Sequence, residues 1–156
     1  MLQHRFIDSV KKDGAKIAFI DRTTKREISF NQALIAGLIL ATRFRKVERG
    51  RIGIMLPTSG GAALAVLGSV MANLTPVMIN YSTGAKQNCQ YAQQECDFKT
   101  IITTRALLEK VDCPLLPKML LIEDILASLK SLEKIWAALK SKLPTALLKR
   151  IAGKKQ

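Results

Sequence analysis

The sequence is poor in the residue types on which most metal and nucleophile sites depend. It has one histidine, His4, and three cysteines that form no Cys-x-x-Cys pair. A single histidine argues against a His-rich metal site and against a His-centred catalytic triad elsewhere in the chain. The odd cysteine count, in a chain whose N-terminus has no apolar run typical of a secretory signal, predicts a reducing, cytoplasmic compartment.

Aromatic and acidic residues are also scarce. Aromatics make up 5% of the chain, and 12 acidic residues face 25 Lys and Arg, giving a net charge of +13. This excess permits phosphate or acidic-protein contacts. Without interleaved aromatics or a recognised binding motif, nucleic acid is not the expected partner. The charge-free stretch 52–85 is broken by Pro57, Gly60 and Pro76, so it falls short of the ~20 apolar residues of a membrane-spanning helix and is interpreted as buried core.

What is present is enough apolar material for one domain, since hydrophobic residues make up 48% of 156. A helix is expected over 1–13, and strands over 16–21 and 27–29. Ser29 and Gln32 have the spacing of a capping box at the start of the next helix. Strands at 51–57, 76–80, 98–103 and 119–123 alternate with helices that begin near Ser59, near Thr83 and at 104. Short strand–helix–strand connections predict an α/β fold with a mainly parallel sheet of repeated βα units.

The chain divides by composition into a core, 1–124, and a basic amphipathic helical tail, 125–156. The tail has eight Lys or Arg and one acidic residue. Its apolar residues recur at spacings of four, three, four, three and four, which predicts one helix face that Pro144 ends or kinks: Ile125, Leu129, Leu132, Trp136, Leu139 and Leu143. Either this face packs on the core and the lysines are solvated, or the tail binds an anionic membrane or an acidic partner through Lys130, Lys134, Trp136, Lys140 and Lys142.

Candidate catalytic groups have plainer explanations. Cys89 and Cys96 are seven residues apart beside alanines, as expected of a helix core face, and Cys113 is interpreted as a loop thiol. Glu123 and Asp124 are adjacent, so they are not spaced as a catalytic dyad and suit the first turn of a helix. The segments 58–61 and 82–86 are interpreted as helix N-caps rather than as phosphate loops. No catalytic, cofactor-binding or metal-binding residue is predicted.

The order of motifs nevertheless resembles a known family. The AMP-forming adenylating enzymes, which include the acyl-CoA and acyl-ACP synthetases, have an early core motif of strand, Leu-Pro-x-Ser, long apolar helix ending in Ala-Gly, and Pro-Val-x-x-Asn. Here Leu56-Pro57-Thr58-Ser59, Ala72-Asn73 and Pro76-Val77 to Asn80 match it. The segments MINYSTGA and CDFKTIITTRALLEK look closest to the acyl-ACP synthetase (2-acylglycerophosphoethanolamine acyltransferase-associated) branch. The resemblance covers residues 1 to about 125 and implies an incomplete N-terminal subdomain of the adenylating-enzyme fold.

The resemblance also defines what is missing. The Ser/Thr/Gly-rich loop ending Thr-Gly-x-Pro-Lys, the later nucleotide motifs and the domain with the catalytic lysine do not occur. The intact enzyme would use ATP and Mg to adenylate a fatty acid, and would pass the acyl group to CoA or acyl carrier protein. This 156-residue chain is expected to bind no cofactor and to be inactive alone, and to pair with the missing C-terminal portion or with itself. The alternative is a non-catalytic module that binds a membrane surface or acyl carrier protein, cytoplasmic or peripheral at the inner membrane face.

Overall fold

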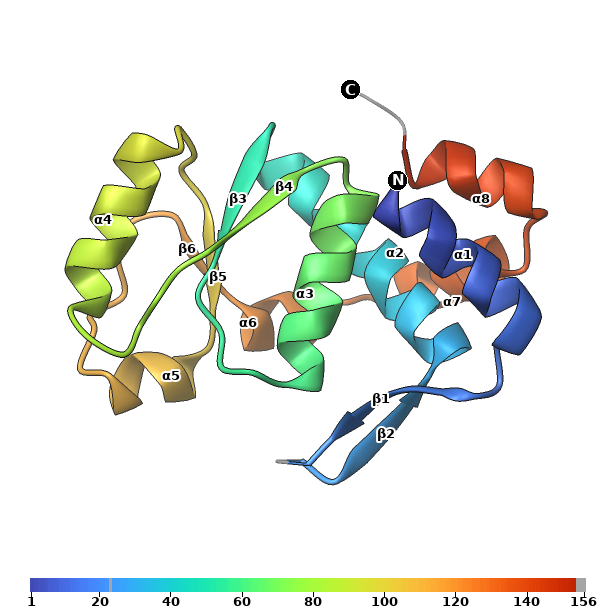
Figure 1. The fold of residues 1–156 in the computed structure, drawn as a ribbon, viewed down its shortest axis with the longest axis horizontal. Helices are drawn as coiled ribbons and strands as arrows, with labels where there is room; N and C mark the ends of the chain where they lie inside the picture. The colour runs from blue at the N-terminus through green and yellow to red at the C-terminus, as the bar shows by residue number, and fades with distance from the viewer. Residues whose placement is uncertain (23, 154–156) are drawn as a thin grey trace.

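The computed structural model describes residues 1–22 and 24–153. Two strand groups and several helices make up this part of the chain (Figure 1). The elements follow one another as α1 (Leu2–Asp13), β1 (Ile17–Asp21), β2 (Arg26–Ser29), α2 (Phe30–Val47), β3 (Arg51–Ile54), α3 (Gly60–Met71), β4 (Thr75–Met78), α4 (Ala85–Glu95), β5 (Ile101–Thr103), α5 (Arg105–Lys110), β6 (Met119–Leu121), α6 (Ile122–Ala127), α7 (Ser131–Ser141) and α8 (Thr145–Ile151).

The main sheet is parallel, as the sequence predicts. Its strand order is β4-β3-β5-β6, and every observed pairing is parallel. Because β4 and β5 lie on opposite sides of β3, the connection from β3 to β4 through α3 runs one way along the sheet, and the connection from β4 to β5 through α4 runs back past β3 in the other direction. Pro76 pairs with Ile52 on the edge strand β4, where its missing backbone N–H leaves no ladder bond unmade inside the sheet.

Side chains of successive strand residues enter two different cores. On β3, Ile52 and Ile54 belong to a cluster with α2 and α3, whereas Met55, just after the strand, belongs to a cluster with α4 and α5. On β5, Ile102 and Ile101 divide in the same way. This alternation follows the period of two in a strand, and it is why apolar residues run continuously through a strand buried on both faces.

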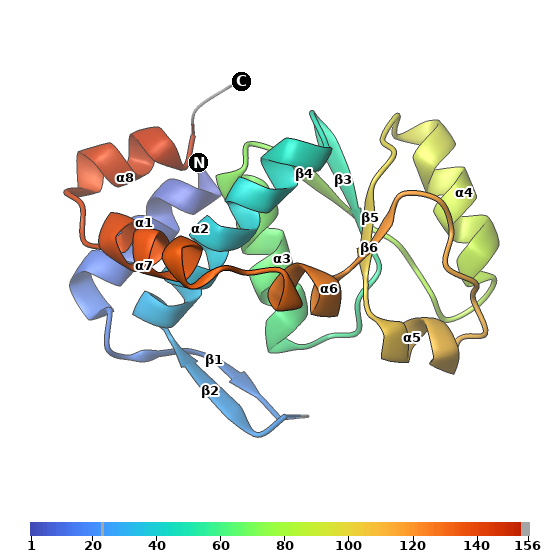
Figure 2. The ribbon, with the colours of Figure 1, turned by 180° about the vertical axis from the view of Figure 1, so that it is seen from behind.

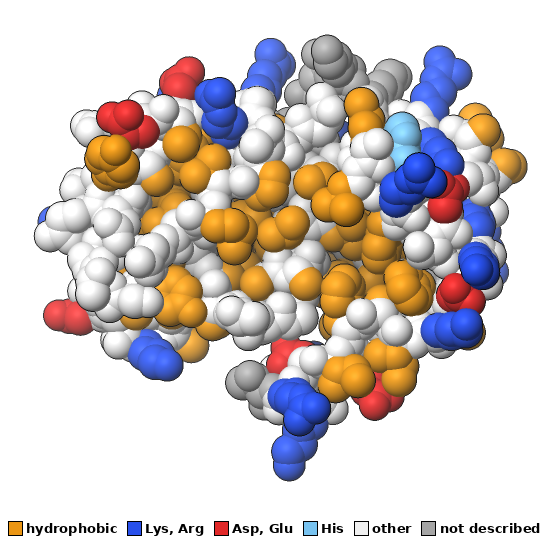
Figure 3. Space-filling model, in the orientation of Figure 1, with side chains coloured by type: hydrophobic (Ala, Val, Ile, Leu, Met, Phe, Trp, Pro, Cys, Tyr) orange, Lys and Arg blue, Asp and Glu red, His pale blue; other side chains and the backbone are white. Residues whose placement is uncertain are grey.

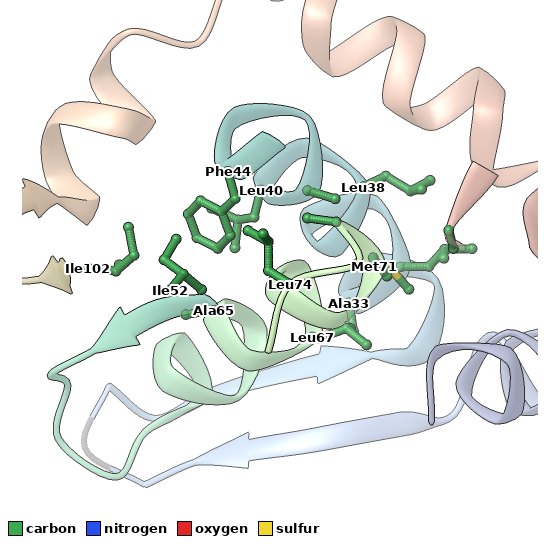
Figure 4. Close-up of a cluster of buried hydrophobic side chains, with 14 of the residues drawn as sticks. Ala33, Leu38, Leu40, Phe44, Ile52, Ala65, Leu67, Met71, Leu74 and Ile102 are labelled. Carbon is green, nitrogen blue, oxygen red and sulfur yellow. The ribbon is translucent and has the colours of Figure 1, made fainter. Parts of the chain in front are cut away.

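The larger core lies between α2, α3 and the sheet (Figure 4). Phe44 and Ile52 are fully buried in it. The two helices approach closely at glycines: a Cβ on Gly68 would lie 2.6 Å from the Cβ of Leu40, and one on Gly37 would lie 2.9 Å from the Met71 sulfur. Small residues at these positions let the helix backbones pack without a side chain between them.

Local signals at helix ends are confirmed in most cases. The Ser29 backbone N–H donates to Gln32 Oε1 over 2.8 Å, and the Gln32 backbone N–H donates to Ser29 Oγ over 3.3 Å, which completes the predicted capping box. Asn73 has φ 63°, the left-handed conformation expected just after α3. The antiparallel pair β1 and β2 precedes α2 and projects from the body of the molecule (Figure 1).

The segment after residue 124 differs from the prediction of a single helix up to Pro144. It forms the second half of α6, which begins at Ile122, and then α7 and α8, with a break at residues 128–130. The break rotates the face that each helix turns inward: Ile125 and Leu148 are buried, while Leu132 is 66% exposed. Figure 2 shows α7 and α8 lying against α2 and α1. Leu148 belongs to the same cluster as Phe44.

Candidate functional site

The loop after β3 is the first place to look for a phosphate site, because it leads into the N-terminus of α3. Ser59 Oγ accepts a hydrogen bond from the Ala62 N–H over 3.2 Å, as the N-cap interpretation predicts. The Asp21 carboxylate, 8% exposed, accepts from the Gly60 N–H over 3.1 Å. The positive end of α3 therefore already holds a negative charge from this chain. A phosphate would have to displace that carboxylate.

The second glycine-containing segment, 82–86, corrects a detail of the sequence interpretation. Neither Ser82 nor Thr83 caps α4; the N-cap is Gly84, with φ 61° and no side-chain cap bond. Asn88 instead holds the loop, since its amide donates to the Asn80 carbonyl over 2.9 Å and to the Thr83 carbonyl over 2.7 Å. The left-handed backbone at this point favours glycine, which explains that residue without a phosphate.

The cysteines lie in the core rather than in a reactive site. Cys89 is fully buried, and burial raises its pKa to about 11. Cys113 lies in a loop, as the sequence predicts, and it is 6% exposed in the core that contains α4 and α5; burial raises its pKa too. Neutral thiols of this kind are poor nucleophiles.

Two acidic residues after β6 have structural partners, as the sequence interpretation favours. Glu123 and Asp124 lie in the first turn of α6. Glu123 Oε1 accepts from the Arg105 N–H over 3.1 Å, and Asp124 lies 3.5 Å from the Arg105 guanidinium. In the described part of the chain, no group of three or more His, Cys, Asp or Glu side chains is placed to hold a metal ion.

The surface predicted on the tail is centred on α7. Trp136 and Lys140 lie on this helix, and the tryptophan is 61% exposed. Lys130 precedes α7 and Lys142 follows it, and both side chains are exposed. Lys134 is exposed on the same helix. The structure therefore places all five predicted residues within one helix and its caps.

The structure adds residues that the sequence interpretation missed. Ile135, 54% exposed, lies on the outer face although it was not in the predicted apolar stripe. Arg43 of α2 holds the acidic residue of α7, with its guanidinium 2.7 Å from Glu133. A cleft of about 140 Å³ between α2, α7 and α8 is lined in part by Arg43, Trp136 and Lys140. In a helix that begins at Ser131, the spacing of residues 132, 135, 136 and 139 indicates one shared apolar face.

Charge around α7 is dominated by lysine. The Glu133 carboxylate is hydrogen-bonded by the Lys130 backbone N–H over 3.0 Å, and this bond together with Arg43 holds its pKa below its usual value. Glu133 is thus ionised and already paired, so the surrounding lysines keep a net positive surface. Among the described helices, none is both long and apolar enough to cross a membrane.

Comparison with known proteins identifies the fold. No protein-family profile matches the sequence. Among solved structures, the AMPPNP-bound nonribosomal peptide synthetase FmoA3 superposes with a TM-score of 0.71 and 14% identity, over 83% of this chain and 14% of its own. O-succinylbenzoate coenzyme A synthetase (MenE) from Bacillus subtilis gives 0.66 and 11%, over 81% and 28%.

The N-terminal domain of FACL13 from Mycobacterium tuberculosis gives a TM-score of 0.62 and 12% identity, over 83% of this chain and 36% of that one. At these identities the likeness establishes the fold alone. The chain has the α/β architecture of the N-terminal subdomain of adenylating enzymes. It spans between 14% and 36% of the length of these three proteins.

Proposed function

We propose that this chain is the N-terminal part of an ATP-dependent, AMP-forming acid–thiol ligase that acts on fatty acids. The observation that carries the proposal is the fold match over about four fifths of the chain. The motif residues support it: the segment 56–59 leaves β3 and caps α3, and the segment 76–80 forms β4 and its exit. The fatty acyl specificity and the acyl-ACP branch rest on the sequence resemblance.

By that resemblance, the intact enzyme joins a fatty acid carboxylate to the α-phosphate of ATP, releases pyrophosphate, and then transfers the acyl group to a phosphopantetheine thiol with loss of AMP. The described residues do not fit ATP or Mg. The start of α3 is occupied by Asp21, and the start of α4 is a left-handed Gly84. No step of the chemistry is therefore assigned to residues of this chain.

The contribution of this chain in the proposed enzyme is a scaffold with an apolar face. Figure 3 shows apolar side chains gathered across the middle of one face, over α3 and β4. Met78 at the end of β4 is 59% exposed, and Val77 and Leu64 are partly buried. A contiguous apolar surface of this kind marks a contact site. We assign it to the remainder of the ligase, with self-association as the alternative partner.

Pyrophosphate exchange tests the proposal. The 156-residue chain, incubated with ATP, Mg, labelled pyrophosphate and fatty acids, is expected to show no exchange. A longer polypeptide that includes this chain and a downstream phosphate loop is expected to exchange label in the presence of a fatty acid. The Met78→Ser variant of the longer polypeptide should lose stability or activity, whereas Leu115→Ser, at an apolar side chain 57% exposed elsewhere, should not.

A second candidate function is binding without catalysis, to a membrane surface or to acyl carrier protein. One observation favours it: the largest apolar side chains of α7 point away from the domain. Co-sedimentation with vesicles and with acyl carrier protein separates the two partners, and neither measurement depends on ligase activity.

A further inference from the structure

Helix α7 is amphipathic, but its large apolar side chains face outward. Leu132, Ile135, Trp136 and Leu139 are 66%, 54%, 61% and 54% exposed. At ~100° per residue these four positions fall within about 100° of arc on the helix surface. We call them the α7 stripe. Ala137, 5% exposed, faces the domain from roughly the opposite side. The helix thus packs on α2 through a small residue and presents the stripe outward.

Lysines border the α7 stripe. Lys140 lies four residues after Trp136 and borders one flank. Lys142 lies seven residues after Ile135 and borders the other. Both are exposed. Glu133, the acidic residue of α7, is turned toward α2 and paired with Arg43 over 2.7 Å. The stripe is therefore apolar along its middle and positive along its edges.

This arrangement points to an anionic lipid surface as the occupant. A helix lying in a bilayer interface has a tryptophan and leucines on the buried side and lysines at the edges, whose long side chains reach the headgroups. Residues 125–156 have eight basic residues and one acidic residue, which complements anionic lipid. An acidic protein would account for the lysines, but it would not by itself account for four exposed apolar side chains in one line, which a bilayer interface buries.

We propose that the chain binds anionic membrane surfaces in the plane of the interface through the α7 stripe, with Lys140 and Lys142 contacting headgroup phosphates. The proposal rests on the second candidate function, binding without catalysis, and does not depend on the ligase assignment. It concerns peripheral contact, since no described helix is suited to cross a bilayer.

Trp136 makes the proposal directly measurable, because it is the one tryptophan of the sequence. Its fluorescence is recorded while the 156-residue chain is titrated with vesicles of phosphatidylcholine containing phosphatidylglycerol, and with vesicles of phosphatidylcholine alone. The anionic vesicles are expected to shift the emission to shorter wavelength as the indole leaves water, and added salt is expected to reduce the binding. The neutral vesicles are expected to produce little change.

Two pairs of variants separate the apolar and charged contributions. Lys140→Gln/Lys142→Gln is expected to weaken binding about 30-fold at low salt, whereas the distant pair Lys86→Gln/Lys110→Gln removes the same charge and is expected to act far less. Leu132→Ser/Leu139→Ser is expected to weaken binding at least about tenfold. These leucines are exposed, so an unchanged thermal melt is expected of the variant.

Several results would overturn the proposal. One is an unshifted emission with anionic vesicles. Another is equal binding to neutral and anionic vesicles, which would mean that charge does not contribute to binding. A third is an equal loss of binding in the two lysine pairs, which would mean that the attraction is not specific to the α7 stripe. Binding that survives the leucine substitutions would place the contact elsewhere. Capture of an acidic carrier protein that needs the lysines but not the leucines, without vesicle binding, would assign the surface to a protein. Pyrophosphate exchange is unaffected by any of these outcomes.

Discussion

Substituting Gly68 by alanine tests the packing of α2 against α3, which forms the larger of the two cores. The added Cβ would lie 2.6 Å from the Cβ of Leu40, and 3.4 Å from a ring carbon of Phe44. Real Cβ contacts are essentially never closer than 3.0 Å. Because the Leu40 atom is itself a Cβ, it cannot move aside by changing rotamer, and the two helix backbones must separate.

The matched control is Gly61→Ala, near the start of the same helix. There the nearest atom to an added Cβ is Ser59 Oγ, at 3.6 Å, which is ordinary contact. Replacing glycine by alanine favours a helix by up to ~1 kcal/mol, less in the first turn. Overpacking a core typically costs ~1–3 kcal/mol. The gain is larger at Gly68, inside the helix, than at Gly61 by about 0.5 kcal/mol, so Gly68→Ala should be less stable than Gly61→Ala by about 0.5–2.5 kcal/mol.

Urea unfolding followed by circular dichroism measures this difference. For a chain of this length the two alanine variants should also differ in Tm by about 1–10 °C. Equal stability of the two variants, or a more stable Gly68→Ala, would refute the close helix approach described here. A folded Gly61→Ala with an unfolded Gly68→Ala would agree with it.

Three further predictions concern a carboxylate, the thiols and activity. Burial opposes ionisation of Glu48, but hydrogen bonds from the backbone N–H groups of residues 99, 100 and 49 hold its pKa low. The stability that the ionised Glu48 gives to the fold is therefore present above the usual glutamate pKa and is lost as the pH falls through the lowered value. Glu48→Gln should therefore cost about 1–2 kcal/mol at neutral pH, and denaturant titrations of the variant and the original should converge in acid. Native protein should react with a thiol reagent at Cys96 before Cys89 and Cys113, and Cys96→Ser should abolish the fast phase. Burial keeps the Cys89 pKa near 11, above its value in the unfolded chain. The contribution of the Cys89 thiol to stability should therefore fall as the pH rises from about 9 to 11. Exchange of labelled pyrophosphate into ATP by the 156-residue chain alone should be undetectable. Exchange that depends on a fatty acid would contradict the conclusion that the described residues do not fit ATP.

Much of the fold could be predicted because the local and long-range signals agree. The Ser29–Gln32 spacing, Asn73 after α3 and the apolar strands each satisfy a local requirement that the parallel sheet also imposes. Strand ends were predicted up to three residues too long, since apolar residues such as Met55 continue the buried pattern after the backbone leaves the sheet. The sequence does not predict Gly84 as the N-cap of α4, because this cap depends on a left-handed backbone conformation and not on a capping side chain.

The tail shows the limit of periodicity. Six apolar residues at helical spacing predict one face, yet the helix is broken at residues 128–130, and Ile125 of α6 is buried whereas Leu132 of α7 is exposed. Spacing defines which residues share a face but not which way the face turns. The direction was decided by tertiary contacts, namely Ala137 and the Arg43–Glu133 pair against α2. The five predicted surface residues lie on α7 and its caps, and the large apolar side chains of this helix face outward.

The coding sequence that follows the Gln156 codon tests the central claim most directly. If the chain is the N-terminal part of an adenylating ligase, the reading frame continues into a Ser/Thr/Gly-rich segment that ends in Thr-Gly-x-Pro-Lys. A termination codon directly after Gln156, or a continuation without that loop and without the later nucleotide motifs, would contradict the claim.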